Sequence, residues 1–147
     1  MDDFDKQVFL LVDDSESDVA LMREAFVKAG VPNPLVVVPG GEEAIAYLKG
    51  EAPYDNPDAR PLPLVLLLDL NMPGKAGFEV LSWVRQQPTL KRLVIIILTA
   101  SSRAVDADTA YDLGANFYLT KPGSFKELVE MTHCLHRWLR LNHFPAS

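Results

Sequence analysis

The apolar residues of this chain fall in short continuous runs, and this pattern constrains its fold more than any other feature of the sequence. Continuous runs of Val, Leu and Ile are typical of strands buried on both faces, as in a parallel sheet that is covered by helices on both sides. The sequence therefore predicts five strands, over residues 8–12, 35–38, 64–68, 93–98 and 116–119.

The segments between these runs carry apolar residues at helical spacing. They predict helices over residues 15–29, 41–49, 78–85, 104–113 and 124–141. Ser15 is suited to cap the first helix, and Asp18, three residues later, completes a pattern that resembles a capping box. Repeated alternation of strand and helix predicts an α/β fold with a doubly wound parallel sheet.

The composition fits one globular domain. The chain has 147 residues, of which 48% are hydrophobic and 23% charged, so it has enough apolar material for a core. The segment 50–63 holds four prolines and is interpreted as an irregular loop that serves as a plain connector. Six residues follow Leu141, where the last predicted helix ends, so we expect no output domain.

The charge and cysteine content favour a cytoplasmic protein. No apolar run approaches the ~20 residues needed to cross a bilayer, and the N-terminus is acidic where a signal peptide would be basic. Cys134 is the single cysteine, which excludes an internal disulfide and a cysteine-based zinc cluster. A net charge of −6 argues against binding to nucleic acid or to an anionic membrane.

Reactive side chains follow four of the five predicted strands. They are Asp13 and Asp14 after the first, Asp69 after the third, Thr99 after the fourth and Lys121 after the fifth. Ligands of open α/β sheets bind beyond these strand ends, so we expect the side chains to form one site. Clustered carboxylates are tolerated around a hard cation such as Mg²⁺, and a lysine and a hydroxyl bind anions. Together they predict a phosphoryl-binding site.

In this arrangement the sequence resembles the receiver domain of two-component response regulators, over about residues 7–141. The residues that carry the resemblance are Asp13-Asp14, Asp69 with Asn71, Met72 and Pro73, Gly77, Thr99-Ala100, and Lys121-Pro122 after Tyr118. It implies a flavodoxin-like sheet of strand order 2-1-3-4-5, a Mg²⁺ cofactor, and a signalling switch that takes a phosphoryl group from a histidine kinase. The longer loop before the third predicted strand and the segments 71–75 and 120–125 look most like the small stand-alone regulators that include partners of bacterial phytochrome kinases.

The resemblance also implies a role for each acidic residue of the site. Asp69 is expected to be the phosphoacceptor. Asp14 is expected to bind Mg²⁺ directly and Asp13 through water. Asn71 is expected to offer its backbone carbonyl to the metal, with its side chain near the path of an attacking water.

The remaining roles concern the phosphoryl oxygens and the switch. Thr99, the backbone N–H of Ala100 and Lys121 are expected to bind the phosphoryl oxygens, and the bond from Lys121 to Pro122 is expected to be cis. Phosphorylation adds negative charge and acceptor oxygens, which draw Thr99 and Lys121 inward. Tyr118 corresponds to the aromatic switch residue, although packing at the sheet edge explains it equally well.

The sequence departs from the family at two places. Ala76 stands where relatives have an acid, so the loop after the phosphoacceptor is expected to be held differently. Gly123 and Ser124 separate Pro122 from Phe125, which is expected to shift the start of the last helix. Ser101 and Asn71 occupy positions that influence the rate of dephosphorylation in the family. The residues found here predict no particular lifetime for the phosphorylated state.

The last predicted helix carries two apolar stripes. Leu128, Leu135 and Leu139 form the first stripe, and Met131, Cys134, Trp138 and Leu141 form the second. So wide a face predicts a homodimer or kinase contact, or is simply a wide core face. His133 and His136 have metal-ligand spacing, but without a third ligand we interpret them as part of a solvated face. Cys134 is interpreted as a core or interface residue.

Three other functions compete with the signalling switch. A phosphatase of the haloacid-dehalogenase type needs an acid where Asn71 stands, and Asn cannot transfer the proton. A flavodoxin-like cofactor site needs a phosphate-binding loop where the Asp13-Asp14 pair stands. A degenerate receiver would act as a constitutive interaction domain. Under the leading interpretation the chain is not an enzyme and catalyses only its own phosphorylation and dephosphorylation. Its signal is expected to pass to a downstream protein or a phosphotransfer protein.

Overall fold

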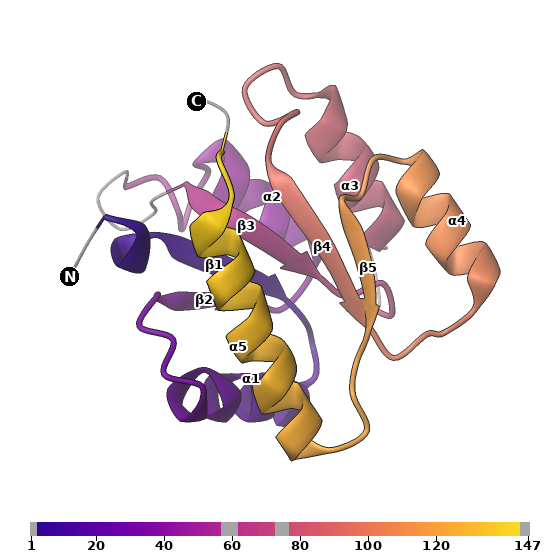
Figure 1. Ribbon diagram of the computed structural model, residues 1–147. Coiled ribbons are helices and arrows are strands. Elements are labelled where there is room, and N and C mark those ends of the chain that lie inside the picture. Colours follow the sequence, from indigo (N-terminus) through magenta and orange to yellow (C-terminus); the bar gives the residue numbers. More distant parts are fainter. Residues whose placement is uncertain (1–2, 57–61, 73–76, 145–147) are drawn as a thin grey trace.

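The computed structural model describes residues 3–56, 62–72 and 77–144. These residues form one sheet of five parallel strands, as the sequence predicted (Figure 1). The strands are β1 (Val8–Val12), β2 (Leu35–Val38), β3 (Pro63–Leu68), β4 (Val94–Thr99) and β5 (Phe117–Thr120). Their order across the sheet is β2-β1-β3-β4-β5, which is the order that the resemblance implied.

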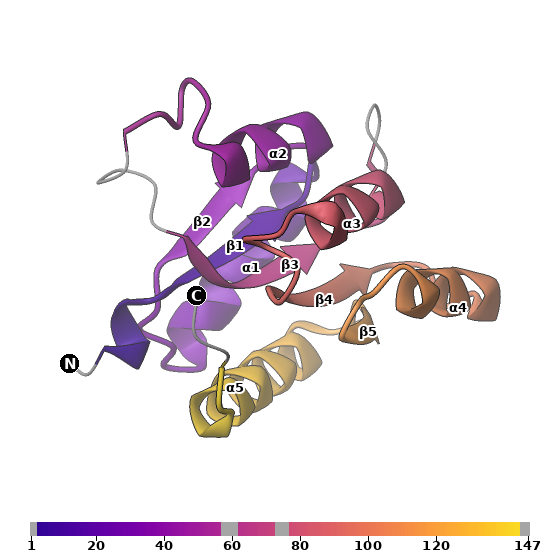
Figure 2. The same ribbon diagram turned by 90° about the horizontal axis from the view of Figure 1, so that it is seen from above.

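In the described part of the chain, five α-helices cover both faces of the sheet (Figure 2). They are α1 (Glu16–Lys28), α2 (Gly41–Lys49), α3 (Gly77–Gln86), α4 (Ala104–Asp112) and α5 (Phe125–Leu141), and a 3₁₀ turn, η1 (Phe4–Lys6), precedes β1. The helices α2, α3 and α4 pack on one face, and α1 and α5 pack on the other. None of the helices described is both long enough and apolar enough to span a membrane.

Side chains of the central strands alternate between two buried cores. In β1, Leu10 and Val12 belong to the core under α2, α3 and α4, whereas Phe9 and Leu11 belong to the core under α1 and α5. The residues of β3 and β4 alternate in the same way. Because helices cover both faces, every position of these strands except Thr99 at the end of β4 is apolar, which explains why the runs are continuous.

The strands β4 and β5 begin one residue later than predicted, and hydrogen bonds explain the shift. The N–H of Leu93 donates to the carbonyl of Leu90 at 2.9 Å, so Leu93 belongs to the preceding turn. The N–H of Ile95 donates to the side-chain Oδ1 of Asn116 at 2.7 Å, in place of a main-chain carbonyl. The regular ladder of β5 therefore starts only at Phe117.

Arg85, near the end of α3, ties several loops together at the end of the sheet where β4 and β5 begin. Its guanidinium donates to the carbonyls of Gly114 at 2.8 Å, Leu93 at 2.6 Å and Lys91 at 3.0 Å, and to Oδ1 of Asn116 at 3.0 Å. Gly114 has φ of +106°, and a Cβ there would lie 2.9 Å from Cγ of Arg85. Both the backbone conformation and the close approach therefore require glycine at this position.

The segment between α2 and β3 forms no helix or strand in its described residues, as predicted, although Pro63, which was assigned to this loop, is the first residue of β3. It is nevertheless more than a plain connector. The ring of Tyr54 packs on the buried ring of Tyr47, with centroids 5.3 Å apart. The start of this loop is thus anchored to the core under α2.

Candidate functional site

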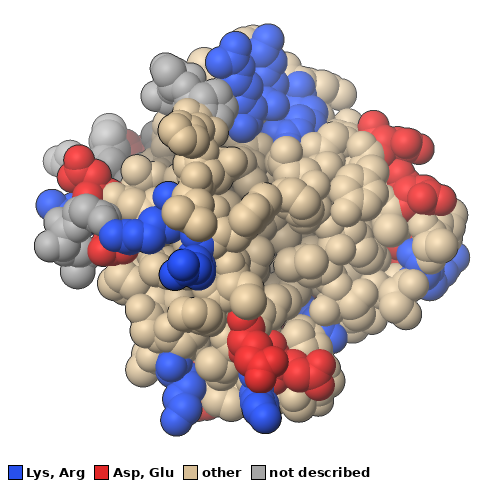
Figure 3. All heavy atoms as spheres, in the orientation of Figure 1, with Lys and Arg blue, Asp and Glu red and all other residues tan. Residues whose placement is uncertain are grey.

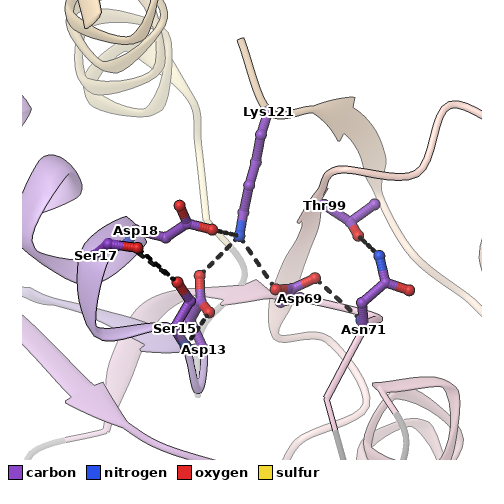
Figure 4. Close-up of polar contacts among 8 residues, drawn as sticks. All are labelled: Asp13, Ser15, Ser17, Asp18, Asp69, Asn71, Thr99 and Lys121. Carbon is purple, nitrogen blue, oxygen red and sulfur yellow. Dashed lines mark hydrogen bonds and ion pairs between the residues drawn. The ribbon is translucent and has the colours of Figure 1, made fainter. Parts of the chain in front are cut away.

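The carboxyl ends of β1, β3, β4 and β5 bring the predicted side chains to one edge of the sheet (Figure 4). Main-chain bonds continue the sheet just past the strands and fix where these residues lie. The N–H of Asp13 donates to the carbonyl of Val38 at 3.2 Å, and the N–H of Asp69 to that of Val12 at 3.1 Å. The N–H of Lys121 donates to the carbonyl of Thr99 at 2.7 Å.

Three carboxylates form an acidic cluster at this edge. Asp13, Asp14 and Asp69 each offer an oxygen within 4.8 Å of the others, with Asp13 and Asp69 buried and Asp14 exposed. Buried carboxylates this close repel one another, and a hard divalent cation with oxygen preference would relieve the repulsion. The donor set therefore fits Mg²⁺ or a similar ion.

The ammonium of Lys121 lies at the centre of the site. Its Nζ donates to Oδ2 of Asp18 at 2.7 Å, of Asp13 at 2.9 Å and of Asp69 at 3.1 Å. Burial alone would lower the pKa of Lys121, but the hydrogen bonds to Asp18 and Asp13 and the charge of Asp69 raise it above its ordinary value. The lysine therefore stays charged and offsets part of the negative charge of the cluster.

Asp13 is a carboxylate held in an unfavourable place. Burial raises its pKa above the ordinary value, and the negative charge of Asp69 adds to that effect. The N–H of Ser15, which donates to Oδ1 of Asp13 at 2.9 Å, and the ammonium of Lys121 oppose the rise without cancelling it. Without a metal, the ionised form of Asp13 is thus destabilised relative to a carboxylate in water.

Asn71 links Asp69 to Thr99. The N–H of Asn71 donates to Oδ1 of Asp69 at 3.1 Å, and its Nδ2 donates to Oγ1 of Thr99 at 3.1 Å. Asp69 therefore has one oxygen bonded to Asn71 and the other to Lys121. The hydroxyl of Thr99 is completely buried, and since it accepts a bond here its own proton remains to be donated.

Gly77 lets α3 begin directly against the loop that carries Asp69. A Cβ at Gly77 would lie 2.6 Å from the carbonyl oxygen of Asp69 and 2.9 Å from Cα of Leu70. Both neighbours are backbone atoms, which cannot move aside without shifting the loop. The expectations for Pro73 and for the loop at Ala76 fall outside the described residues.

Tyr118 is bonded at both ends. Its hydroxyl donates to the carbonyl of Ser101 at 2.9 Å, and its N–H donates to the hydroxyl of Tyr111 at 3.2 Å. The ring is half-buried against the core under α2, α3 and α4. Oγ of Ser101 donates to Asp106 at 2.5 Å, so the loop after β4 is held from two sides. The roles assigned to Tyr118 and Ala100 remain predictions.

Asp18 belongs to the site, although the sequence pattern predicted only a role in capping the first helix. Its N–H donates to Oγ of Ser15 at 3.3 Å, which is half of the predicted capping box. Its carboxylate is not the other half, because it pairs with Lys121 at 2.7 Å. The available signal was its place in the first turn of α1, directly after the Asp13-Asp14 pair, where the helix faces the strand ends.

Three smaller expectations are corrected. The bond from Lys121 to Pro122 is trans, and Ala52–Pro53 is the one cis bond among the described residues. After Gly123, Ser124 caps α5 by accepting the N–H of Glu127 at 3.1 Å.

The other two corrections concern α5. His136 is not on a solvated face, because its ring lies against Phe4 with centroids 5.5 Å apart and its Nε2 is 3.8 Å from Asp5. His133 is exposed, as expected. Cys134 is exposed as well, which excludes the core and leaves the interface as the remaining part of that prediction.

Comparisons with known proteins agree with this geometry. Residues 9–133 match the family model described as "Response regulator receiver domain". The chain is 37% identical over 142 residues to the response regulator Rcp1 of Synechocystis sp., covering 96% of this chain and 95% of Rcp1.

Two solved structures are similar over nearly the same length. The phosphorylated cyanobacterial phytochrome response regulator RcpA has 36% identity and a TM-score of 0.87, with 96% of this chain and 99% of RcpA covered. A response regulator in red light signalling of R. palustris has 32% identity and a TM-score of 0.91, with 96% and 99% covered. With its sheet order, its strand-end residues and these matches in agreement, the chain belongs to the receiver domain family of response regulators.

Proposed function

We propose that Asp69 accepts a phosphoryl group from the phosphohistidine of a kinase, and that this chain is a switch that phosphorylation activates. One observation carries the proposal. The carboxylate of Asp69 lies between the ammonium of Lys121 at 3.1 Å and the N–H of Asn71 at 3.1 Å, beside a second buried carboxylate. A strand-end carboxylate held in this way presents a fixed nucleophile next to a fixed cation.

The proposed cofactor is Mg²⁺. Asp13, Asp14 and Asp69 would hold it, together with the backbone carbonyl of Asn71. When bound, the ion neutralises negative charge on the phosphoryl oxygens. A crystal structure of the related Rcp1 is described as its Mn²⁺-bound form, which supports a divalent ion in this family.

The chain's own residues then perform the transfer. An oxygen of Asp69 forms the new bond to phosphorus while the bond from phosphorus to the donor histidine nitrogen breaks, and that nitrogen keeps the electron pair. The phosphoryl oxygens accept hydrogen bonds from Lys121, the hydroxyl of Thr99 and the N–H of Ala100. The proton of the Thr99 hydroxyl suits this role, since Thr99 only accepts from Asn71 in the present arrangement.

The signal would leave the site through the loop after β4. A phosphoryl group draws Thr99 inward and opens space beside it. The hydroxyl of Tyr118 is bonded to the carbonyl of Ser101 in that loop, so the ring and the loop would move together. The surface formed by α4, β5 and α5 would change, and a partner would recognise the change.

The competing functions are weaker. Asn71 occupies the position where a phosphatase of the haloacid-dehalogenase type needs an acid, and its side chain is committed to Thr99. We propose that the chain has no activity on external substrates and that it signals through contact with another protein.

For the phosphodonor we propose a phytochrome-type histidine kinase. RcpA is named a phytochrome response regulator, and the R. palustris protein is described as acting in red light signalling. The similarity extends over 96% of this chain in both cases. It therefore includes the surface around the strand ends that a donor must approach.

A second copy of this chain is the other partner that we propose. Phe117 of β5 and Trp138 of α5 stack edge to face with centroids 4.7 Å apart, and 38% and 44% of their surfaces are exposed. Leu141 adds a further exposed apolar side chain at the end of α5. Figure 3 shows uncharged surface between α5 and α4, with charged side chains around it. Such patches commonly mark protein interfaces.

The first prediction concerns the phosphoacceptor. Incubation with acetyl phosphate and Mg²⁺ is expected to add one labile phosphoryl group, detected by intact-protein mass spectrometry. Asp69→Asn and a chelator are each expected to abolish the adduct, because one removes the nucleophile and the other the metal. If no adduct forms, beryllofluoride binding distinguishes rapid hydrolysis from a degenerate receiver. Absence of both signals would contradict the proposed function.

The second prediction concerns the stability cost of Asp13. Its raised pKa means that the protonated carboxyl favours the folded state at low pH, and that this contribution is lost as the pH rises through the raised value. At neutral pH without divalent metal, Asp13→Asn is therefore expected to raise the urea midpoint of unfolding. The gain should shrink as the pH falls toward about 3, below the ordinary Asp pKa, where the carboxyl is protonated in both states.

Asp14→Asn is the matched control, since it removes the same charge from an exposed neighbour and should change the midpoint less. Mg²⁺ is expected to raise the urea midpoint of the parent chain by more than it raises the midpoint of the Asp13→Asn variant. A lower midpoint for Asp13→Asn in metal-free solution would mean that its pair with Lys121 outweighs the effect of burial.

The third prediction concerns the donor. A purified phytochrome histidine kinase, phosphorylated with labelled ATP, is expected to transfer label to this chain faster than a histidine kinase of another sensor class. Gel autoradiography over time measures both rates, with Asp69→Asn as the blank. Equal rates from the two kinases would contradict a phytochrome-type donor.

The fourth prediction concerns self-association. Multi-angle light scattering at high concentration is expected to show a dimer, more populated with beryllofluoride and Mg²⁺ than without. Trp138→Glu should shift the population to monomer. Val27→Glu, a change on the exposed surface of α1, should not. A strict monomer under every condition would exclude the dimer.

A further inference from the structure

The shortest contact of the Lys121 ammonium is to a carboxylate outside the predicted phosphoryl-binding set. Nζ is 2.7 Å from Asp18, compared with 2.9 Å from Asp13 and 3.1 Å from Asp69 (Figure 4). An ammonium has three N–H donors, and these three carboxylates engage all of them. Any further acceptor must therefore displace one of the three.

The three carboxylates differ in how easily they can be released. The side chain of Asp18 is 41% exposed, whereas those of Asp13 and Asp69 are 2% and 7% exposed. Asp18 projects from the first turn of α1, and Asp13 and Asp69 lie at strand ends within the sheet. Asp18 can turn into water, where its charge is solvated, while the other two would remain buried and lose their counter-charge.

A phosphoryl group on Asp69 creates the competition. It brings three acceptor oxygens and additional negative charge to a site that already holds four carboxylates and one lysine. If Lys121 is to bind a phosphoryl oxygen, one of its present contacts must break. Asp18 is the contact that breaks at the lowest cost, and its charge repels the incoming group while it stays in place.

We propose that Asp18 is a positioning residue that holds Lys121 in the resting site and must release it when Asp69 is phosphorylated. This inference rests on the function proposed above. Asp18 thereby opposes the phosphorylated state and sets how readily the site takes a phosphoryl group. Lys121 remains placed after the release, because Asp13 and Asp69 still hold it from the sheet.

The test measures beryllofluoride affinity at saturating Mg²⁺, by ¹⁹F NMR over a titration, in the full chain. Asp18→Asn and Asp18→Ala are expected to bind about two- to fivefold more tightly than the parent chain, the range that loss of a partly exposed ion pair supports. Asp18→Ala also removes any amide oxygen that could still accept from Lys121. Asp18→Glu restores the carboxylate and is expected to return the affinity to that of the parent chain.

Glu16→Gln is the matched control. Glu16 is an exposed acid in the same first turn of α1 and is not among the carboxylates that Lys121 contacts. It tests whether loss of any nearby negative charge has the same effect. Urea unfolding of all variants should give midpoints close to the parent value, because the backbone bond from Asp18 to Ser15 is retained.

The outcomes are distinct. Tighter binding in both Asp18→Asn and Asp18→Ala, but not in Glu16→Gln, supports the inference. Equal affinity in Asp18→Asn and Glu16→Gln, or weaker binding in the Asp18 variants, overturns it while the proposed function stands. Failure of every protein, including the parent chain, to bind beryllofluoride overturns the proposed function and this inference together.

Discussion

The contacts of one ammonium with two buried carboxylates hold this molecule's site together. Asp13 and Asp69 follow neighbouring strands of a parallel sheet, so the main chain places their charges side by side inside the protein. Lys121 lies between the two carboxylates and offsets their mutual repulsion. The short connection from β5 to α5 carries that lysine directly after the last residue of β5. The position of α5 across α1 is therefore tied to the electrostatics of the site as well as to the apolar core that the two helices share.

Such a site is maintained at the expense of stability. Burial raises the pKa of Asp13, which means that the folded chain disfavours the very charge that a metal requires. A chain selected for stability alone would have an apolar or neutral residue at this strand end. The retained carboxylates are thus a physical mark of function, and they carry more information about it than the sheet does, since the same fold supports many activities.

Most of the fold followed from the sequence because both faces of the sheet are covered, and residues such as Leu10 and Leu11 show this directly by entering opposite cores. Thr99 and Lys121 were predictable because a parallel topology brings strand ends together. Where a side chain has two possible hydrogen-bonding partners, the sequence does not predict which of them it contacts. The carboxylate of Asp18 could cap its own helix or reach a lysine more than 100 residues away, and the pattern of residues is the same in both cases. His136 and the bond before Pro122 likewise depend on neighbours distant in sequence.

The network around Arg85 has a consequence for motion. It clamps the carbonyl of Gly114 and the side chain of Asn116, so the turn between α4 and β5 is pinned to α3. The cluster of Asp69, Thr99 and Lys121 lies at the opposite end of the same strands. The C-terminal end of α4 is thus held more firmly than its start. A displacement that begins at Thr99 would therefore move the start of α4, where Ser101 and Asp106 lie, more than its C-terminal end.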